Sequence, residues 1–267
     1  MNDILRVEGI FVRFGGVMAL GNVSASMAQK SITAIIGPNG AGKTTLINVI
    51  SQAVPQTKGK VYFKGGDVSG LPQHKIAEMG IARTFQNLRL FRHMTALENV
   101  MVARHIKSTS GFLSCALKLP ASRRDEKAIR SNAKDFLDFV GLADKAGTDA
   151  LSMPFGLQRH LEIARAMALE PEVMLLDEPA GGLNPGETES LAGLIHKIRD
   201  RGITVVLIEH DMSLVMNISD HIMVLNYGQK IAEGTPREIQ ENDAVIEAYL
   251  GKQASPGSRR SDSTPAG

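Results

Sequence analysis

The apolar residues of this 267-residue chain follow two different patterns. From Ile4 to Ile36, apolar and polar positions alternate and glycines interrupt them, as is typical of antiparallel strands joined by turns. Later in the chain, continuous apolar runs at 173–176 and 204–208 indicate strands that are buried on both faces of a sheet. Helical patterns separate these runs, and strands that alternate with helices predict a largely parallel sheet. The expected fold class is therefore α/β, with an antiparallel β subdomain at the start of the chain.

A block of helical patterns interrupts this alternation at about 88–168. Thr95 and Glu98 have the spacing of a capping box, so a helix is expected to begin there. Two further helices are expected at 122–140 and 157–169, where apolar residues recur at helical spacing. The block is therefore expected to form an α-helical subdomain inserted into the α/β core.

Short elements complete the expected fold. The helices are expected at 44–50, 72–79 and 185–201, and the strands at 59–63, 81–85, 221–225 and 230–233. From Lys252 onward the chain consists largely of Ser, Pro, Gly and Arg, which predicts a disordered tail at 252–267. One domain is therefore expected to cover residues 1–251.

The composition removes several classes of function. Thirty basic and 28 acidic residues give a net charge of +2, which argues against a dedicated nucleic-acid binder. Cys115 is the single cysteine, so a disulfide framework or a cysteine metal site within one chain is excluded, and a reduced, cytoplasmic setting fits. No apolar run approaches the roughly 18 residues that span a bilayer, and the start of the chain does not read as a signal peptide. Any role at a membrane is therefore expected to be peripheral.

The strongest chemical signal is a glycine-rich segment between a β-type apolar run and a helical one. Its residues are Gly37, Pro38, Asn39, Gly40, Ala41, Gly42, Lys43, Thr44 and Thr45. Two glycines five positions apart, followed by Lys and a hydroxyl residue, form the phosphate-binding loop motif, in which backbone N–H groups and a helix N-terminus hold phosphates. Lys43 is expected to reach the β- and γ-phosphates, and Thr44 to ligate Mg²⁺. The sequence therefore predicts ATP and Mg²⁺ as ligands.

Polar residues follow the two continuous apolar runs, at the strand ends where parallel sheets bind ligands. Asp177 follows four apolar residues, where a carboxylate is costly unless it meets a cation, and Mg²⁺ bound to ATP would supply one. Glu178 is expected to take a proton from the attacking water or to orient it. His210 fits either a contact with the γ-phosphate or an ordinary core or loop histidine.

Two other positions carry weaker signals. Phe14, just before the Gly15–Gly16 turn, fits either stacking on adenine or packing in the core. Gln86 follows an expected strand, and it fits either a ligand of Mg²⁺ that positions water or a surface amide.

These segments together resemble the ATP-binding subunits of ATP-binding-cassette (ABC) transporters, from about residue 4 to residue 251. The resemblance implies a P-loop NTPase (RecA-like) core with an antiparallel β subdomain and an inserted α-helical subdomain. It assigns adenine stacking to Phe14, the glutamine loop to Gln86, the signature motif to Gly156, the second Walker motif to Asp177 and Glu178, a loop facing the other subunit to 182–184, and the switch histidine to His210. Gln86, Glu178 and His210 would then act in catalysis.

Three phrases narrow the resemblance to one ATPase of the branched-chain amino acid importers, and they lie at 83–92, 161–165 and 177–185. It implies an ATP-hydrolysing, energy-coupling subunit bound peripherally at the cytoplasmic face of the inner membrane. A second ABC ATPase subunit and two transmembrane permease subunits would be its partners, a periplasmic solute-binding protein would act indirectly, and nucleic acid would not take part. Importers of urea, amides or other amino acids, a lipopolysaccharide-type exporter and a non-transport ABC ATPase stay open as alternatives.

The signature segment departs from the family pattern. Where the family usually has Leu-Ser-Gly-Gly-Gln, this chain has Met153-Pro154-Phe155-Gly156-Leu157. Pro154 stands at the position of the usual serine and has neither a hydroxyl nor a backbone N–H. Because the segment contacts the nucleotide of the other subunit in this family, the sequence suggests an asymmetric heterodimer with two unequal ATP sites.

Overall fold

The computed structural model describes residues 3–84, 90–105 and 120–250. Within these ranges the strands form a four-stranded sheet of order β2-β1-β4-β5 and a six-stranded sheet of order β10-β9-β3-β8-β7-β6. The smaller sheet contains β1 (Asp3–Phe14), β2 (Val17–Ala28), β4 (Lys58–Phe63) and β5 (Gly66–Asp67). The larger contains β3 (Ile32–Ile36), β6 (Ile81–Arg83), β7 (Val173–Asp177), β8 (Thr204–Ile208), β9 (His221–Asn226) and β10 (Gln229–Gly234).

The larger sheet is parallel except for β10, which pairs antiparallel with β9. Every residue of β3, β7 and β8 is buried, because the sheet is covered on both faces. Alternate residues of β7 enter different cores: Val173 and Leu175 face the side of the antiparallel sheet and α1, and Met174 and Leu176 face the helices. The predicted α/β class and the antiparallel first sheet are confirmed.

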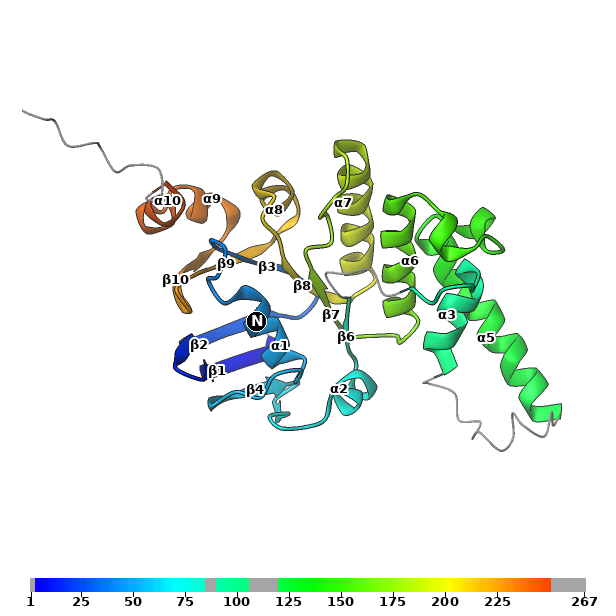
Figure 1. The fold of residues 1–267 in the computed structure, drawn as a ribbon, viewed down its shortest axis with the longest axis horizontal. Coiled ribbons are helices and arrows are strands. Elements are labelled where there is room, and N and C mark those ends of the chain that lie inside the picture. Colours follow the sequence, from blue (N-terminus) through cyan, green and yellow to red (C-terminus); the bar gives the residue numbers. More distant parts are fainter. Residues whose placement is uncertain (1–2, 85–89, 106–119, 251–267) are drawn as a thin grey trace, which may run out of the picture.

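Helices surround the larger sheet (Figure 1). Those from the first half of the chain are α1 (Lys43–Ile50), α2 (Gln73–Met79), α3 (Ala96–His105) and α5 (Pro120–Phe139). Those from the second half are α6 (Phe155–Met167), α7 (Pro185–Asp200), α8 (Met212–Ile218), α9 (Pro236–Gln240) and α10 (Asp243–Leu250). None of the helices in the described ranges is long and apolar enough to cross a membrane.

The expected helical block is present as α3, α5 and α6, which pack together at the end of the molecule away from β1 and β2 (Figure 1). The capping box before α3 forms as predicted, because Glu98 N–H donates to Thr95 Oγ1 (3.2 Å) and Thr95 N–H donates to Glu98 Oε2 (2.8 Å). The block's boundaries at about 88–168 and the domain limit at 251 stay predictions, and the tail at 252–267 lies outside the described residues.

Candidate functional site

The phosphate loop joins the end of β3 to the start of α1, and two of its glycines are required by close backbone neighbours. Gly37 has a φ of 147° and Gly42 a φ of 101°, which L side chains rarely adopt. A Cβ at Gly37 would lie 2.0 Å from the Leu225 carbonyl oxygen, and one at Gly42 would lie 2.8 Å from that of Ala19. The loop is therefore wedged between β9 and β2, which fixes the direction of its N–H groups.

Lys43 places its ammonium group inside this loop. The residue is 8% exposed, and Nζ donates to the carbonyl oxygens of Gly37 (2.8 Å) and Pro38 (3.1 Å). Burial lowers the pKa of Lys43, while the charges of Glu178 and Asp177 raise it. The loop thus holds a cation next to the N-terminus of α1, where a phosphate group would find both.

A cavity of about 540 Å³ lies over the loop and brings together residues that are far apart in the sequence. It is lined by Ala19, the seven loop residues from Asn39 to Thr45, Glu178 and His210. Its volume falls within the roughly 300–1,000 Å³ of small-molecule sites. The carboxylate and the imidazole that the sequence singled out therefore face the phosphate loop across one cavity.

Phe14 and Gly156, two other predicted site residues, are not among the described residues that line this cavity. Phe14 is 52% exposed at the end of β1, so it is not the core residue of the alternative interpretation, and it does not line the cavity. Gly156 lies buried near the start of α6, where a Cβ would be 2.6 Å from Glu187 Oε1 of the same chain. Gln86 lies outside the described residues.

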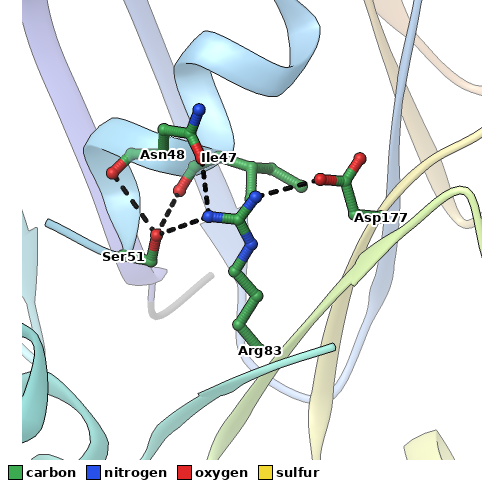
Figure 2. Close-up of polar contacts among 5 residues, drawn as sticks. All are labelled: Ile47, Asn48, Ser51, Arg83 and Asp177. Carbon is green, nitrogen blue, oxygen red and sulfur yellow. Dashed lines mark hydrogen bonds and ion pairs between the residues drawn. The ribbon is translucent and has the colours of Figure 1, made fainter. Parts of the chain in front are cut away.

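Asp177, at the end of β7, meets an arginine that the sequence analysis did not single out (Figure 2). Arg83 Nη2 donates to Asp177 Oδ2 (3.0 Å). Its Nη1 donates to Asn48 Oδ1 (2.6 Å) on α1 and to Ser51 Oγ (3.1 Å) at the C-cap of α1. Asp177 is only 2% exposed, so this ion pair compensates a charge that would otherwise be costly to bury. Arg83 also ties the end of β6 to the helix that follows the phosphate loop.

The ion pair with Arg83 affects whether Asp177 could also bind Mg²⁺. The sequence analysis attributed the compensating cation to Mg²⁺, whereas the protein supplies Arg83 itself. The second carboxylate oxygen, Oδ1, is buried and has no hydrogen-bond partner within the described chain. Together with the exposed Thr44 beside the loop, this oxygen is a donor of the kind that Mg²⁺ prefers, so the residues present fit the ion.

Glu178 has an unusual backbone conformation. Its φ is 48°, a left-handed value that costs a non-glycine residue about 1–3 kcal/mol. Two hydrogen bonds hold it: Glu178 N–H donates to Ile208 O (3.0 Å), and Gly181 N–H donates to Glu178 O (3.2 Å). The turn directs the side chain away from the path of the strand and into the lining of the cavity.

A second residue that the sequence analysis passed over is Glu209, which lies between β8 and His210. It is 1% exposed, and its carboxylate accepts N–H groups from Ala180 (2.7 Å) and His210 (3.1 Å). Burial raises the pKa of Glu209, and the backbone hydrogen bonds oppose this shift. A carboxylate directly after a continuous apolar run is the same signal that identified Asp177, and it applied here as well.

Comparison with known proteins agrees with this geometry. A model of the family described as "ABC transporter" matches residues 20–181, from the second strand through the phosphate loop to the loop after Glu178. The chain belongs to the ABC transporter family. A second model, described as "Branched-chain amino acid ATP-binding cassette transporter", matches residues 229–255 at the C-terminal end of this ABC protein.

Relatives of this ABC protein extend over nearly its whole length. The high-affinity branched-chain amino acid transport ATP-binding protein BraF of Pseudomonas aeruginosa is 48% identical over 250 residues, which are 93% of this chain and 98% of BraF. LivG of Escherichia coli, which carries the same description, is 46% identical with the same coverage. Members of this family are ATPases coupled to transport, and the resemblance inferred from the sequence is confirmed.

Solved structures give the same fold. The ADP conformation of MJ1267, an ATP-binding cassette of an ABC transporter, matches with a TM-score of 0.82 and 33% identity, and covers 94% of this chain and 100% of that one. A dimeric post-hydrolysis state of the cassette MJ0796, bound to ADP and Pi, matches with a TM-score of 0.73 and 25% identity over 87% of this chain and 99% of that one.

Proposed function

We propose that this protein is the ATP-hydrolysing, energy-coupling subunit of an importer for branched-chain amino acids. The observation that carries the proposal is the full-length similarity to BraF and LivG, which are named as branched-chain amino acid transport ATP-binding proteins. The C-terminal family model of the same transporters supports it, because it matches a different part of the chain. ATP is the substrate, and the solute is handled by other subunits.

In this proposal, the residues around the cavity have different roles in ATP hydrolysis. The phosphate loop and Lys43 hold the β- and γ-phosphates, and Thr44 and Asp177 would hold Mg²⁺, which would neutralise phosphate charge when bound. Glu178 orients the attacking water and accepts its proton, while His210 contacts the γ-phosphate from the neighbouring strand end. The strained backbone of Glu178 supports this role, since strain of this kind concentrates at active sites.

The exposed position of Phe14 supports adenine stacking, because an aromatic ring at the tip of the β1–β2 hairpin is accessible to a base that extends beyond the loop. In this proposal, Gly156 contacts the nucleotide that is bound to the second ATPase subunit. This role accounts for its absence from the lining of this chain's own cavity. Two transmembrane permease subunits would hold the ATPase pair at the cytoplasmic face of the membrane, and Gln86 would report the nucleotide to them.

Pro154 supports the proposal of two unequal ATP sites. It is the N-cap residue of α6 with φ −51° and ψ 148°, and it makes no side-chain cap hydrogen bond. A serine there would supply a hydroxyl group that the neighbouring nucleotide could use. Replacing the catalytic glutamate of this chain and of its partner ATPase in turn, in the purified transporter, tests this: the two losses of turnover should differ, and equal losses would contradict asymmetry.

Solute uptake tests the proposed function. In cells that lack this chain, uptake of labelled leucine, urea and glutamate would be measured, with wild type or Glu178→Gln restored. Loss of leucine uptake that only the wild type rescues is the expected result. Intact leucine uptake with loss of another solute would replace the substrate and keep the mechanism. An unchanged uptake of all three solutes would contradict the proposal of a branched-chain importer, and it would leave an importer of another solute, an exporter and a non-transport ATPase as the alternatives.

A further inference from the structure

The carboxylate of Glu209 joins the two strand ends that carry Glu178 and His210. Oε1 accepts the N–H of Ala180 at 2.7 Å, two residues after Glu178, and Oε2 accepts the N–H of His210 at 3.1 Å. Oε2 also lies 3.8 Å from His210 Nδ1. One buried side chain therefore touches the backbone of both loops and faces the imidazole ring.

This bridge begins where the sheet stops. β7 and β8 pair in parallel up to Asp177 and Ile208, and the hydrogen bond from Glu178 N–H to Ile208 O (3.0 Å) is the next link. Beyond this hydrogen bond the two segments that follow β7 and β8 leave the sheet, and the Glu209 carboxylate continues the connection between them. Without it, the Ala180 N–H would lose its acceptor in a buried position, which is unfavourable.

The charge of this carboxylate is directed at the histidine. The Glu209 side chain is fully buried, whereas that of His210 is 64% exposed. Within the described ranges, the His210 ring is the only potentially cationic group in an ion pair with Glu209. A carboxylate on the Nδ1 side favours the tautomer that carries the proton on Nδ1, and it leaves the other ring nitrogen for the cavity that His210 lines.

We propose that Glu209 is a positioning residue for ATP hydrolysis: it sets the distance between the Glu178 loop and the His210 loop, and it orients the His210 ring. The inference rests on the proposed function, since it assigns Glu209 to the ATPase reaction of that site. Glu209 acts through its neighbours and does not itself line the cavity.

The test is a double-mutant cycle of Glu209→Gln and His210→Ala in the assembled transporter, with the partner's catalytic glutamate replaced so that one site turns over. Glutamine keeps the size of the side chain, but its NH₂ group cannot accept the second N–H. Glu209→Gln should lower kcat by about tenfold or more, as misplacement of catalytic groups does, while KM for ATP changes by less than about twofold. In the His210→Ala background the same change should lower kcat by less than about threefold.

Two controls separate positioning from folding. Glu238→Gln alters a carboxylate that also accepts a backbone N–H, from Thr235 in the capping box of α9, and its kcat should stay at the wild-type level. If Glu209→Gln fails to fold, as judged by Tm, Glu209→Asp takes its place, because it keeps the charge and is one methylene too short to reach both loops.

An unchanged kcat in Glu209→Gln, or an equal loss of kcat with and without the His210 ring, would overturn the inference. The absence of ATP turnover in the wild-type complex would instead contradict the proposed function. The two failures are therefore distinguishable.

Discussion

Strands β7 and β8 lie side by side, and each has a buried carboxylate at its C-terminal end: Asp177 is the last residue of β7, and Glu209 directly follows β8. The protein compensates these two charges in different ways. Asp177 forms an ion pair with Arg83 from β6, at 3.0 Å. Glu209 instead accepts backbone N–H groups from Ala180 and His210, and no lysine or arginine within the described ranges pairs with it.

The difference shows which carboxylate is available to a ligand. Arg83 occupies Oδ2 of Asp177 and leaves Oδ1 buried without a partner in the described chain, so this oxygen has capacity for a metal or its water. Both oxygens of Glu209 are occupied by the protein's own N–H groups. We infer that Asp177 serves the nucleotide directly and that Glu209 serves it through Glu178 and His210.

Asp177→Asn should give the largest effect of this comparison. The change removes the negative charge that Arg83 compensates, and it replaces one of the two oxygens by an NH₂ group, so a single oxygen is left for both Arg83 and Mg²⁺. ATP turnover should fall by about 100-fold, the factor that corresponds to about 3 kcal/mol of lost transition-state stabilisation. Steady-state hydrolysis as a function of Mg²⁺ concentration checks this, and the half-saturating Mg²⁺ concentration should rise.

A matched control exists at the opposite end of the sheet. Asp220 also lies near an arginine, Arg199 (3.6 Å), and accepts the N–H of Ile32 (2.8 Å). Asp220→Asn should leave turnover unchanged, since Asp220 lies next to the start of β3 and just before β9, at the opposite ends of these strands from the phosphate loop. Equal losses in the two variants would mean that Asp177 acts only through stability.

The sequence predicted the strands and the chemistry at their ends better than it predicted the partners of those residues. Continuous apolar runs located β7 and β8, because a strand that is buried on both faces has apolar residues at nearly every position and not at alternate ones. Arg83 escaped notice because its partner Asp177 is 94 positions away, and only the pairing of β6 with β7 brings them together. Helices α8, α9 and α10 were not predicted, because five to eight residues show little helical periodicity. Helices α1 and α2 are as short, and they were predicted because the phosphate loop precedes α1 and Pro72 precedes α2.

Arg83→Met should have the next largest effect, on stability. It leaves Asp177 buried without its counter-charge, which costs about 3–5 kcal/mol for a buried pair. Urea unfolding should therefore show a lower free energy of unfolding, and Mg·ATP should stabilise this variant more than it stabilises the wild type, because the ion brings a cation to the same carboxylate.

Arg104→Met is the control for this change, since Arg104 pairs with Glu170, whose side chain is 55% exposed. The ion pair with an exposed partner contributes only about 0–1 kcal/mol, so the loss should be much smaller. A comparable loss in both variants would contradict the special position of the Arg83–Asp177 pair.

The smallest effect concerns the pH dependence of stability. Burial raises the pKa of Glu209 above its ordinary value of 4.5, so the folded protein holds this proton more tightly than the unfolded chain. The contribution of Glu209 to stability therefore falls as the pH rises from 4.5 through the raised pKa of the folded state. Glu209→Gln removes this titration, so the free energy of unfolding of the wild type minus that of the variant should decrease over this window. A difference that is constant with pH would show that Glu209 titrates alike in both states.

The most direct measurement of the central claim compares ATP binding and ATP turnover in Glu178→Gln, in the complex whose partner site is disabled. Glutamine keeps the shape of the side chain but cannot take a proton from water, so turnover should fall by at least about 100-fold. ATP affinity should stay within about twofold, because the phosphate loop and Lys43 are unchanged. Near-normal turnover in this variant would contradict the assignment of Glu178 as the base and, with it, the account of the cavity as the hydrolytic site.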